Sequence, residues 1–257
     1  MDAESRQDQI LNQLRARARL SVEELTAHFG VSSQTIRADL RELHGRGLLK
    51  RTHGGAVHVD TASSREYGAR RMLNHRQKEA MGELAASLIP DESSVTLNIG
   101  TSTEQVAKAL SGHNGLMVLS NNINIINALI GTRSKELVLV GGAVRQSDGA
   151  IVGEDAVEFI SRYKVDFAVI GASAMDADGA ILDFDAREVS VARAILRNAR
   201  TRILVCDGSK FDITAPIRIC DVAELDYVVT DRPPPEQFVA RARQGQTEIL
   251  VAEQSDG

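Results

Sequence analysis

The sequence predicts an α/β protein in two parts, a small and mainly helical N-terminal domain and a larger domain built around a mainly parallel sheet. Two observations support this class. After residue 77, short continuous apolar runs alternate with amphipathic helical patterns, which is typical of a parallel sheet covered on both faces. Before residue 58, apolar residues recur instead at the three- and four-residue spacing of helices. We therefore expect domains at residues 1–58 and 78–257, joined by a polar and basic linker at residues 59–77 that can be helical towards its end.

Composition narrows the functional classes. The 257 residues are 43% hydrophobic and carry a net charge of −5, which argues against a nonspecific nucleic-acid coat. Residues 1–58 nevertheless hold nine Lys and Arg against seven Asp and Glu, and residues 65–78 hold five against one. A weakly basic N-terminal part on an acidic remainder suits a protein that touches DNA at one end only.

Cysteine content and hydropathy predict a cytoplasmic protein without a membrane segment. The only cysteines are Cys206 and Cys220, and no signal peptide or long apolar run is present. No cluster of His and Cys has the spacing of a metal site, so we expect neither a metal nor a cofactor.

Two helices are expected to open the N-terminal domain. The first, at residues 5–18, carries Ile10 and Leu14 on its inner face. The second begins at a capping box, in which the Ser21 hydroxyl accepts from one backbone amide and Glu24 reaches back to another.

A third helix is expected after a left-handed stop at Gly30, running from a cap at Ser32 to about His44. Apolar residues share one of its faces, and the opposite face is polar and basic. The inner residues are Ile36, Leu40 and Leu43, and the outer residues are Gln34, Arg37, Ala38 and Arg41. Two short helices about a glycine turn are typical of the helix-turn-helix, although a small helical hairpin with a solvated face is the alternative.

The segment after these helices favours the DNA-binding interpretation. Residues 48–57 combine a short apolar and basic strand with a glycine turn, as in a winged helix-turn-helix. Side chains of such a hairpin lie against phosphate or in the minor groove. The expected DNA-binding residues are Ser33, Gln34, Thr35, Arg37, Arg41, Arg51 and His53.

The N-terminal motifs resemble those of the DeoR family of bacterial repressors. The similarity lies in Val-Ser-Ser-Gln-Thr-Ile-Arg at residues 31–37, Asp-Leu at 39–40 and His-Gly-Gly-Ala at 53–56. Ala38 departs from the pattern, because the family usually has a second arginine there. The resemblance therefore implies a repressor that lacks one contact to phosphate or base.

The larger domain alternates helices and strands. Helices are expected at residues 78–88, 103–110, 123–129 and 187–198, and strands at 94–99, 116–120, 136–140, 166–171, 202–206, 227–230 and 248–251. Ligands of open α/β sheets bind beyond the carboxyl ends of the strands, so the residues that follow the strands are the candidates for a binding site.

Small, hydroxyl and amide residues follow four of these strands. Residues 100–103 read Gly-Thr-Ser-Thr and open a helix, which makes an anion cradle of free amides and hydroxyls, although a capped turn is the alternative. Two asparagines end the next strand, two glycines the third, and Asp-Gly-Ser-Lys at residues 207–210 offers a cation to the same anion. The expected effector-binding residues are Asn98, Gly100, Thr101, Ser102, Thr103, Asn121, Asn122, Gly141, Gly142, Glu188, Asp207, Ser209 and Lys210.

From residue 78 to about 235 the chain resembles the DeoR-family sensor domain, which is related to ribose-5-phosphate isomerase. The similarity lies at residues 141–142, 148–154, 176–179, 184–185, 188–189, 207–211 and 230–235. Asn98 stands where an aspartate is common in part of the family, which implies a change in the hydroxyls that the site prefers. The resemblance implies a repressor of a carbohydrate or glycerol catabolic regulon that a phosphorylated metabolite releases from operator DNA. Glycerol 3-phosphate is the first candidate.

The alternative is an isomerase-like enzyme with an accessory DNA-binding module. The related isomerases have Asp-Gly-Ala-Asp where this chain has Ile-Gly-Ala-Ser at residues 170–173. Their catalytic lysine has no counterpart, because residues 179–185 contain none. We therefore expect binding without turnover and no catalytic residue. Because one small recognition helix contacts few base pairs, we also expect a homo-oligomer, a dimer or a tetramer.

Overall fold

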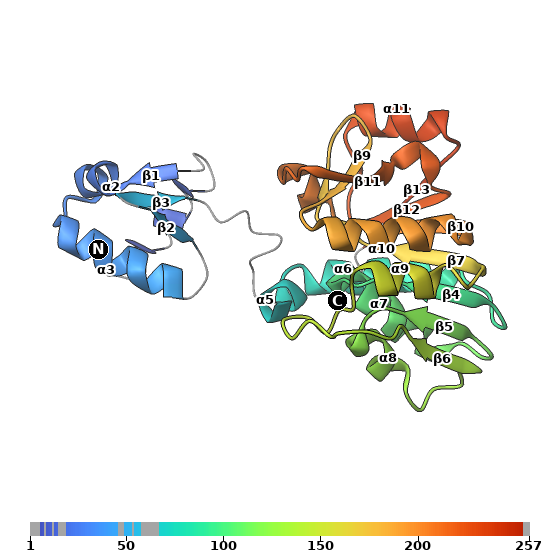
Figure 1. The fold of residues 1–257 in the computed structure, drawn as a ribbon. Helices are drawn as coiled ribbons and strands as arrows, with labels where there is room; N and C mark the ends of the chain where they lie inside the picture. The colour runs from blue at the N-terminus through green and yellow to red at the C-terminus, as the bar shows by residue number, and fades with distance from the viewer. Residues whose placement is uncertain are drawn as a thin grey trace. The chain divides into compact units, whose positions relative to one another are not determined.

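The computed structural model describes residues 6–7, 9–11, 13–14, 19–45, 49–52, 54–57 and 67–253. The chain divides into two compact units, Met1–Gly68 and Ala69–Gly257 (Figure 1). Each unit has its own hydrophobic core. Among the described residues, no helix is long and apolar enough to cross a membrane.

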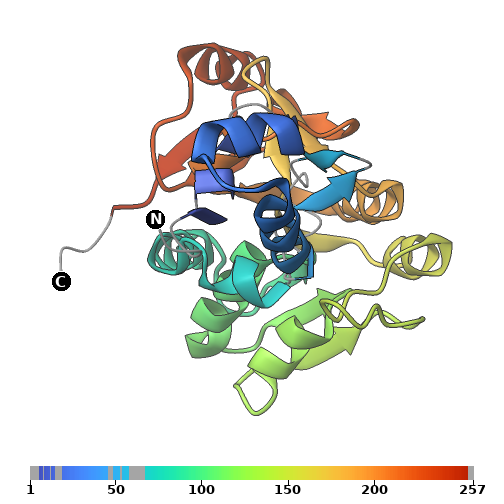
Figure 2. The same cartoon turned by 90° about the vertical axis from the view of Figure 1, so that its left-hand side faces the viewer.

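The N-terminal unit packs helices against a small antiparallel sheet (Figures 1 and 2). The described residues between 6 and 14 are helical. They are followed by β1 Arg19–Ser21, α2 Val22–Phe29, α3 Ser33–Gly45, β2 Lys50–Thr52 and β3 Gly55–Val57. The sheet order is β1-β3-β2, so β2 and β3 form the expected hairpin and β1 extends it. The strand β1 was not predicted, because it is only three residues long and its last residue, Ser21, is the helix cap.

Local signals in this unit are confirmed. The amide of Glu24 donates to Ser21 Oγ at 3.1 Å, and the amide of Ser21 donates to Glu24 Oε2 at 2.7 Å, which completes the capping box. Gly30 ends α2 with φ 63°. Ile10, Leu14, Ile36, Leu40 and Leu43 all lie in one buried cluster, as their helical spacing predicts.

The C-terminal unit is built on a seven-stranded parallel sheet of order β13-β12-β10-β7-β4-β5-β6. Its strands are β4 Ser94–Leu97, β5 Met117–Ser120, β6 Glu136–Leu139, β7 Val165–Ile170, β10 Ala199–Val205, β12 Tyr227–Thr230 and β13 Glu248–Val251. The helices are α5 Tyr67–Met72, α6 His75–Ser87, α7 Thr101–Ala109, α8 Ile123–Leu129, α9 Glu154–Ile160, α10 Ala186–Arg197 and α11 Glu236–Gln244. The predicted α/β class is confirmed.

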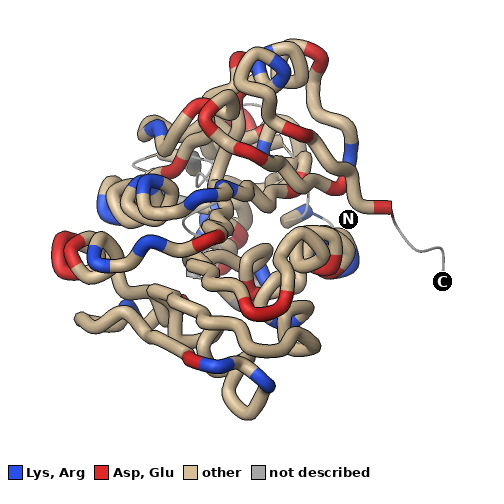
Figure 3. The backbone as a smooth tube through the Cα atoms, turned by 90° about the vertical axis from the view of Figure 1, so that its right-hand side faces the viewer, with Lys and Arg blue, Asp and Glu red and all other residues tan. Residues whose placement is uncertain are grey.

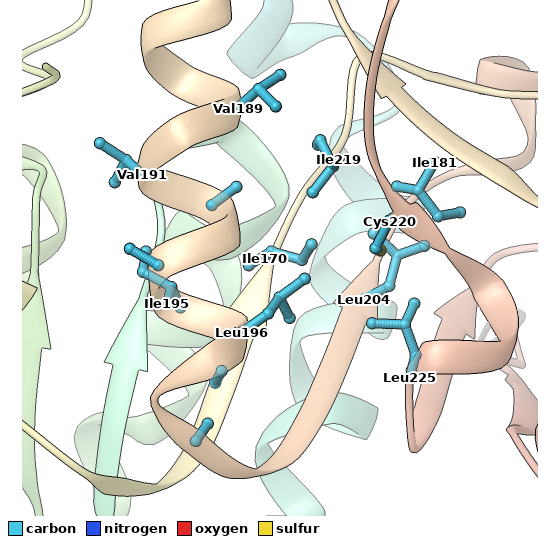
Figure 4. Close-up of a cluster of buried hydrophobic side chains, with 14 of the residues drawn as sticks. Ile170, Ile181, Val189, Val191, Ile195, Leu196, Leu204, Ile219, Cys220 and Leu225 are labelled. Carbon is cyan, nitrogen blue, oxygen red and sulfur yellow. The ribbon is translucent and has the colours of Figure 1, made fainter. Parts of the chain in front are cut away.

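Helices cover both faces of this sheet. α6, α7 and α8 bury their apolar residues in one cluster with alternate residues of the strands, and α9, α10 and α11 do so in another. Figure 4 shows part of the second cluster, which includes Leu196 of α10, Ile170 of β7 and Leu204 of β10. Val169, the neighbour of Ile170, belongs to the opposite cluster, as the two-residue period of a strand requires.

Several elements were not predicted. α9, α11 and a small antiparallel sheet of β8 Ala174–Met175, β9 Ala180–Asp183 and β11 Ile217–Asp221 escaped the periodicity argument, because they are short and carry mixed polarity. The short 3-10 helices η1 Leu110–Gly112, η2 Gly208–Asp212 and η3 Val222–Glu224 escaped it as well.

The expected linker also needs correction. Residues 58–66 lie outside the described residues, but α5 and the first turn of α6 occupy positions 67–77, and the second unit begins at Ala69. Lys78 holds this segment on the second unit by two hydrogen bonds to backbone carbonyls. Sequence periodicity did not predict these two hydrogen bonds, because they depend on the burial of Lys78 in the folded unit.

The strand order indicates where a ligand site is expected in such a sheet. β4 lies between β5, which follows it in the chain, and β7, which belongs to the other half of the sheet. The chain therefore changes direction across the sheet at the β4–β7 pair. Ligands of such sheets bind outside the carboxyl ends of the strands at this switch point.

Candidate functional site

The outer face of α3 is exposed as expected. Gln34, Arg37 and Arg41 are all exposed, as is Ser33 in the first turn. Thr35 differs, because its amide donates to Ser32 Oγ at 3.1 Å and its hydroxyl lies 2.9 Å from the same atom. Thr35 therefore completes the helix cap, and its side chain is partly occupied by that role.

The β2–β3 hairpin holds its residues rigidly. Arg51 is exposed and pairs with Ala56 across the hairpin. Gly55 is required, because an added Cβ would lie 2.1 Å from the carbonyl oxygen of Leu20 in β1. The wing is thus locked onto the strand that leads into α2. His53 lies outside the described residues.

An ion pair that the sequence did not reveal supports α3. Arg6 Nε lies 2.6 Å from Asp39 Oδ2, and both side chains are almost fully buried. Gln7 Nε2 donates to Glu42 at 2.9 Å. The Asp-Leu pair at residues 39–40 therefore has a structural role, fastening the first helix to the back of α3. Helical spacing could have predicted that Asp39 lies beside the apolar face of α3. It could not have identified Arg6 as the partner of Asp39.

The expected anion cradle lies at the switch point. Gly100 has φ 144°, and α7 begins at Thr101 without a side-chain cap. The first helical hydrogen bond runs from Glu104 to the carbonyl of Gly100 at 3.0 Å, so the amides of residues 101–103 precede it. The Thr103 hydroxyl donates to Gly100 O at 2.8 Å and is engaged there. Thr101 and Ser102 carry the other two hydroxyls of this turn.

The asparagines after β5 have different roles. Asn122 caps α8, accepting from the amide of Asn124 at 2.8 Å, and its Nδ2 donates to Asp148 O at 2.9 Å. Both ends of this side chain are used within the fold. Asn121 donates to Ile151 O at 3.0 Å, which leaves its buried Oδ1 without a hydrogen-bond partner among the described residues.

Asn98, after β4, matches Asn121 in one respect. Its Oδ1 is also buried and has no hydrogen-bond partner among the residues that the structure describes. Buried acceptors of this kind are uncommon in native proteins, and each calls for a donor. Two amide oxygens of the same chemistry thus follow the neighbouring strands β4 and β5.

Of the two glycines after β6, only Gly142 has a packing role. Gly141 is exposed, and no atom lies within 4 Å of an added Cβ. Gly142 has φ 141°, and an added Cβ would lie 2.9 Å from Ile151 Cγ2. Val144 then forms a bridge with Ile151. Gly142 thus lets the loop after β6 fold back on residues 150–151.

Glu188 lies in a second group of charges on α10. Arg145 Nη2 lies 2.6 Å from Glu188 Oε1 and contacts Asp148, which also accepts from Arg145 Nε at 2.9 Å. Burial, and then repulsion from Asp183, raise the pKa of Glu188 to about 7 in spite of Arg145. Arg145 does not prevent the rise, because Asp148 is its principal partner.

A further group of charges consists of Asp207 and the lysines near it. Asp207 is 2% exposed, caps η2 and accepts from the Ser209 hydroxyl. Burial works against its ionisation, but Lys210, Ser209 and Lys78 together hold the pKa of Asp207 below its usual range. Lys210 is half-buried.

Lys78 is the candidate site residue that sequence reasoning missed. It is 3% exposed, and burial lowers its pKa to about 8, opposed by Asp207 and reinforced by Lys210 and Arg70. The sequence offered a weak signal, since a lysine stands where the apolar face of α6 begins. Its position near the carboxyl ends of the parallel strands could be known only from the fold.

The packing of α6 on α7 brings Lys78 to the anion cradle. An added Cβ on Gly82 would lie 2.7 Å from the carbonyl carbon of Gln105, so the two helices are in close contact there. Both helices begin at the carboxyl edge of the sheet. One turn before this contact, Lys78 therefore lies beside the first turn of α7. Lys78 and Lys210 both act on the carboxylate of Asp207, and Arg70 lies close enough to Lys78 to contribute to the lowering of its pKa.

The remaining charges of the C-terminal unit are mixed. In the view of Figure 3, acidic and basic positions are interspersed along the described part of this unit, without an extended basic stretch. Among the described residues, no group of His, Cys, Asp and Glu has the arrangement of a metal site.

Comparison with known proteins decides the family. Residues 73–232 match the DeoR C terminal sensor domain, and residues 6–62 match the DeoR-like helix-turn-helix domain. The chain belongs to the DeoR family. It is a DNA-binding transcriptional repressor with a sensor domain, and the family is not one of enzymes, so the expectations on both points are confirmed.

Curated relatives of this DeoR-family repressor span almost its full length. It is 38% identical to the glycerol-3-phosphate regulon repressor of Escherichia coli K12 over 235 residues, covering 91% of this chain and 93% of the relative. The protein of that name from Haemophilus influenzae is 40% identical over 232 residues, 90% of each chain. The HTH-type transcriptional repressor GlcR of Bacillus subtilis is 30% identical over 259 residues, 100% of this chain and 99% of the relative.

Among solved structures, the similarity is weaker. Ribose 5 phosphate isomerase A from Neisseria gonorrhoeae gives a TM-score of 0.38 with 12% identity, covering 52% of each chain. A similarity at this level carries no functional weight for the DeoR-family chain.

Proposed function

We propose that this DeoR-family repressor controls a carbohydrate or glycerol catabolic regulon and leaves its operator when a small phosphorylated metabolite binds the sensor domain. Glycerol 3-phosphate is the first candidate, because two of the relatives are named as repressors of that regulon. One observation carries the proposal: the buried Lys78, which α6 holds beside the uncapped start of α7 at the switch point of the sheet, has the half-buried Lys210 as a cationic neighbour.

A phosphate suits this site on electrostatic grounds. The ammonium of Lys78 is partly destabilised by burial and by Lys210, so an anion between them would relieve both effects. The amides of residues 101–103, with the hydroxyls of Thr101 and Ser102, would supply oriented donors to the same phosphate. Asp207 and Ser209 bond to each other and position Lys210 rather than contact the phosphate directly.

A polyol suits the rest of the site. The buried amide oxygens of Asn98 and Asn121 are acceptors that need donors, and hydroxyl groups are donors. A hydroxyl in contact with them would satisfy a buried group that is otherwise left unpaired. Glu188, Gly141 and Gly142 would border the site, and Asn122 would shape it by capping α8.

Operator DNA would be bound through α3 and the wing. Ser33, Gln34, Arg37 and Arg41 would face the major groove, and Arg51 with His53 would contact the backbone or the minor groove. A single recognition helix covers too few base pairs to select one genomic site, so we propose paired N-terminal units in a dimer or tetramer. Such a repressor would act in the cytoplasm.

A binding assay tests the proposed function. A DNA fragment selected from a random library by the full-length protein is labelled, and its fluorescence anisotropy is followed while glycerol 3-phosphate is added. We expect the metabolite to weaken DNA binding by about five- to 150-fold, the range of typical allosteric couplings. Glycerol and inorganic phosphate serve as controls and should act only at much higher concentration. DNA binding that responds to no sugar or polyol phosphate would contradict the proposal.

A further inference from the structure

The buried Lys78 ammonium holds the end of α5 as well as facing the proposed effector site. It donates to the carbonyl oxygen of Arg70 at 2.7 Å and to that of Leu73 at 2.8 Å. An ammonium has three donors, so two of them are committed to this backbone. The last turn of α5 and the turn after it are thereby fastened to the site.

Two more contacts fasten the same segment to other parts of the site. The guanidinium of Arg71, in α5, lies 2.6 Å from the buried carboxylate of Glu104, in the first turns of α7. The amide of Asn74 donates to Asp207 at 3.3 Å. Asn74 precedes α6, but its side chain makes no capping hydrogen bond to that helix. The side chain instead contacts Asp207.

The segment held by these contacts is the part of the chain that connects the sensor domain to the N-terminal unit. The boundary between the two compact units falls between Gly68 and Ala69, within α5. Any change that reaches the N-terminal unit along the chain must pass through this helix.

We propose that α5 is the element through which effector binding is transmitted to the DNA-binding unit, with Lys78 as the switch. This inference rests on the proposed function. A phosphate carries a full negative charge, whereas the carbonyl oxygens of Arg70 and Leu73 are neutral acceptors, so a phosphate would draw the donors of Lys78 away from these carbonyls. The end of α5 would then be released or repositioned.

The coupling also needs the contacts of Arg71 and Asn74. They join α5 to α7 and to the end of β10, the two elements that would close on the phosphate. Without them, a change at the site would no longer reach α5. An effector shifts an equilibrium only by its differential affinity for two states, and these contacts are what make the two states of α5 differ at the site.

The test compares full-length variants that remove these contacts without touching the anion cradle. Arg71→Gln keeps the length of the side chain and removes its charge. Asn74→Gly removes the amide and tolerates the left-handed backbone at this position, where φ is 53°. Arg76→Ala is the matched control, because Arg76 is an exposed arginine of the adjacent helix. Calorimetry measures the affinity for glycerol 3-phosphate, and anisotropy measures operator release.

We expect both variants to bind glycerol 3-phosphate within about threefold of the wild-type affinity, and operator DNA normally. Their operator release should fall from about fivefold or more to less than about twofold, whereas Arg76→Ala should behave as the wild type. Variants that bind the metabolite and release DNA as the wild type does would overturn the inference. So would a loss of metabolite binding in both variants, because it would place these residues within the site. If the wild type binds neither glycerol 3-phosphate nor any other sugar or polyol phosphate, the proposed function is overturned, and the inference that rests on it falls as well.

Discussion

The guanidinium of Arg145 lies 2.6 Å from the carboxylate of Glu188, and this ion pair joins the loop after β6 to helix α10. The same guanidinium bonds to Asp148 within its own loop and lies 3.5 Å from Asp185. One cation therefore serves three carboxylates. Because it is shared, Glu188 gains less from the pair than its short distance suggests.

This sharing predicts a pH dependence of stability. The pKa of Glu188 is raised from 4.5 to about 7, chiefly by burial and then by Asp183. The folded protein thus holds this proton more tightly than the unfolded chain. The stabilisation is complete below pH 4.5 and is lost as the pH rises to about 7, by roughly 3 kcal/mol.

Glu188→Gln isolates this contribution. Urea unfolding at pH 5 and pH 8 should show that the wild type loses more stability than the variant between the two values. The difference between the proteins is the informative quantity, since all other titrating groups are common to both. An identical pH dependence in the wild type and the variant would contradict the assignment.

Gly82 should tolerate no side chain. An added Cβ would lie 2.7 Å from the backbone of Gln105, and overpacking of this kind costs about 1–3 kcal/mol. Alanine favours a helix by about 1 kcal/mol over glycine, which offsets only part of that cost. We expect Gly82→Ala to lower the melting temperature by a few degrees and to weaken metabolite binding, because α6 also carries Lys78.

Gly112→Ala is the control for this change. No atom lies within 4 Å of a Cβ at Gly112, so its substitution should leave the melting temperature and the metabolite affinity unaltered. A Gly82→Ala protein as stable as the Gly112→Ala protein would mean that α6 and α7 are not in close contact.

Asp39→Ala should damage the N-terminal unit alone. The buried Arg6 would lose its carboxylate, and breaking a buried pair in this way costs about 3–5 kcal/mol. We expect DNA binding to be lost and the N-terminal unit to become sensitive to protease, while calorimetry with the metabolite is unchanged. Glu23→Ala, at an exposed acid of α2, should retain both activities. Normal DNA binding by Asp39→Ala would show that the pair does not support α3.

Local chemistry explains what the sequence predicted well. The capping box of Ser21 and Glu24 and the glycine stop at Gly30 involve residues close together in the chain, and their geometry follows from residue type. The parallel strands were found because their apolar runs are continuous. The strand-to-helix turn at residues 100–103 was placed because a strand, a glycine and a helix meet there.

Tertiary contacts explain what was missed. The pairing of Arg6 with Asp39 joins residues 33 positions apart, and the contact of Asn74 with Asp207 joins residues 133 positions apart. The burial of Lys78 likewise depends on the packing of distant parts of the chain. No local pattern announces them. Asn122, expected at the ligand, turned out to cap α8, a role that its place before a helix could have indicated.

The exposed arginines of α3 and of the β2–β3 hairpin are expected to affect DNA binding in different ways. Arg37 is exposed on the outer face of α3, so Arg37→Ala should cost about 1–3 kcal/mol of operator binding if it contacts a guanine edge. Arg51→Ala should weaken all DNA sequences alike and lower the salt slope by about one unit. Arg243→Ala, an exposed arginine of α11, is the charge-matched control and should change neither. Operator binding unchanged by Arg37→Ala would remove this residue from the groove.

The most direct test of the sensor is calorimetry of glycerol 3-phosphate with the wild type, Lys210→Ala and Lys108→Ala. Lys108 is exposed in the last turn of α7, at the other end of the helix whose first turn forms the cradle. Because charge-assisted bonds contribute about 1.5–3 kcal/mol, Lys210→Ala should bind the metabolite at least about tenfold more weakly and should no longer release operator DNA in response to it. Lys108→Ala should match the wild type, and all three proteins should bind the operator equally. Wild-type affinity for the metabolite in Lys210→Ala would contradict the proposed phosphate site.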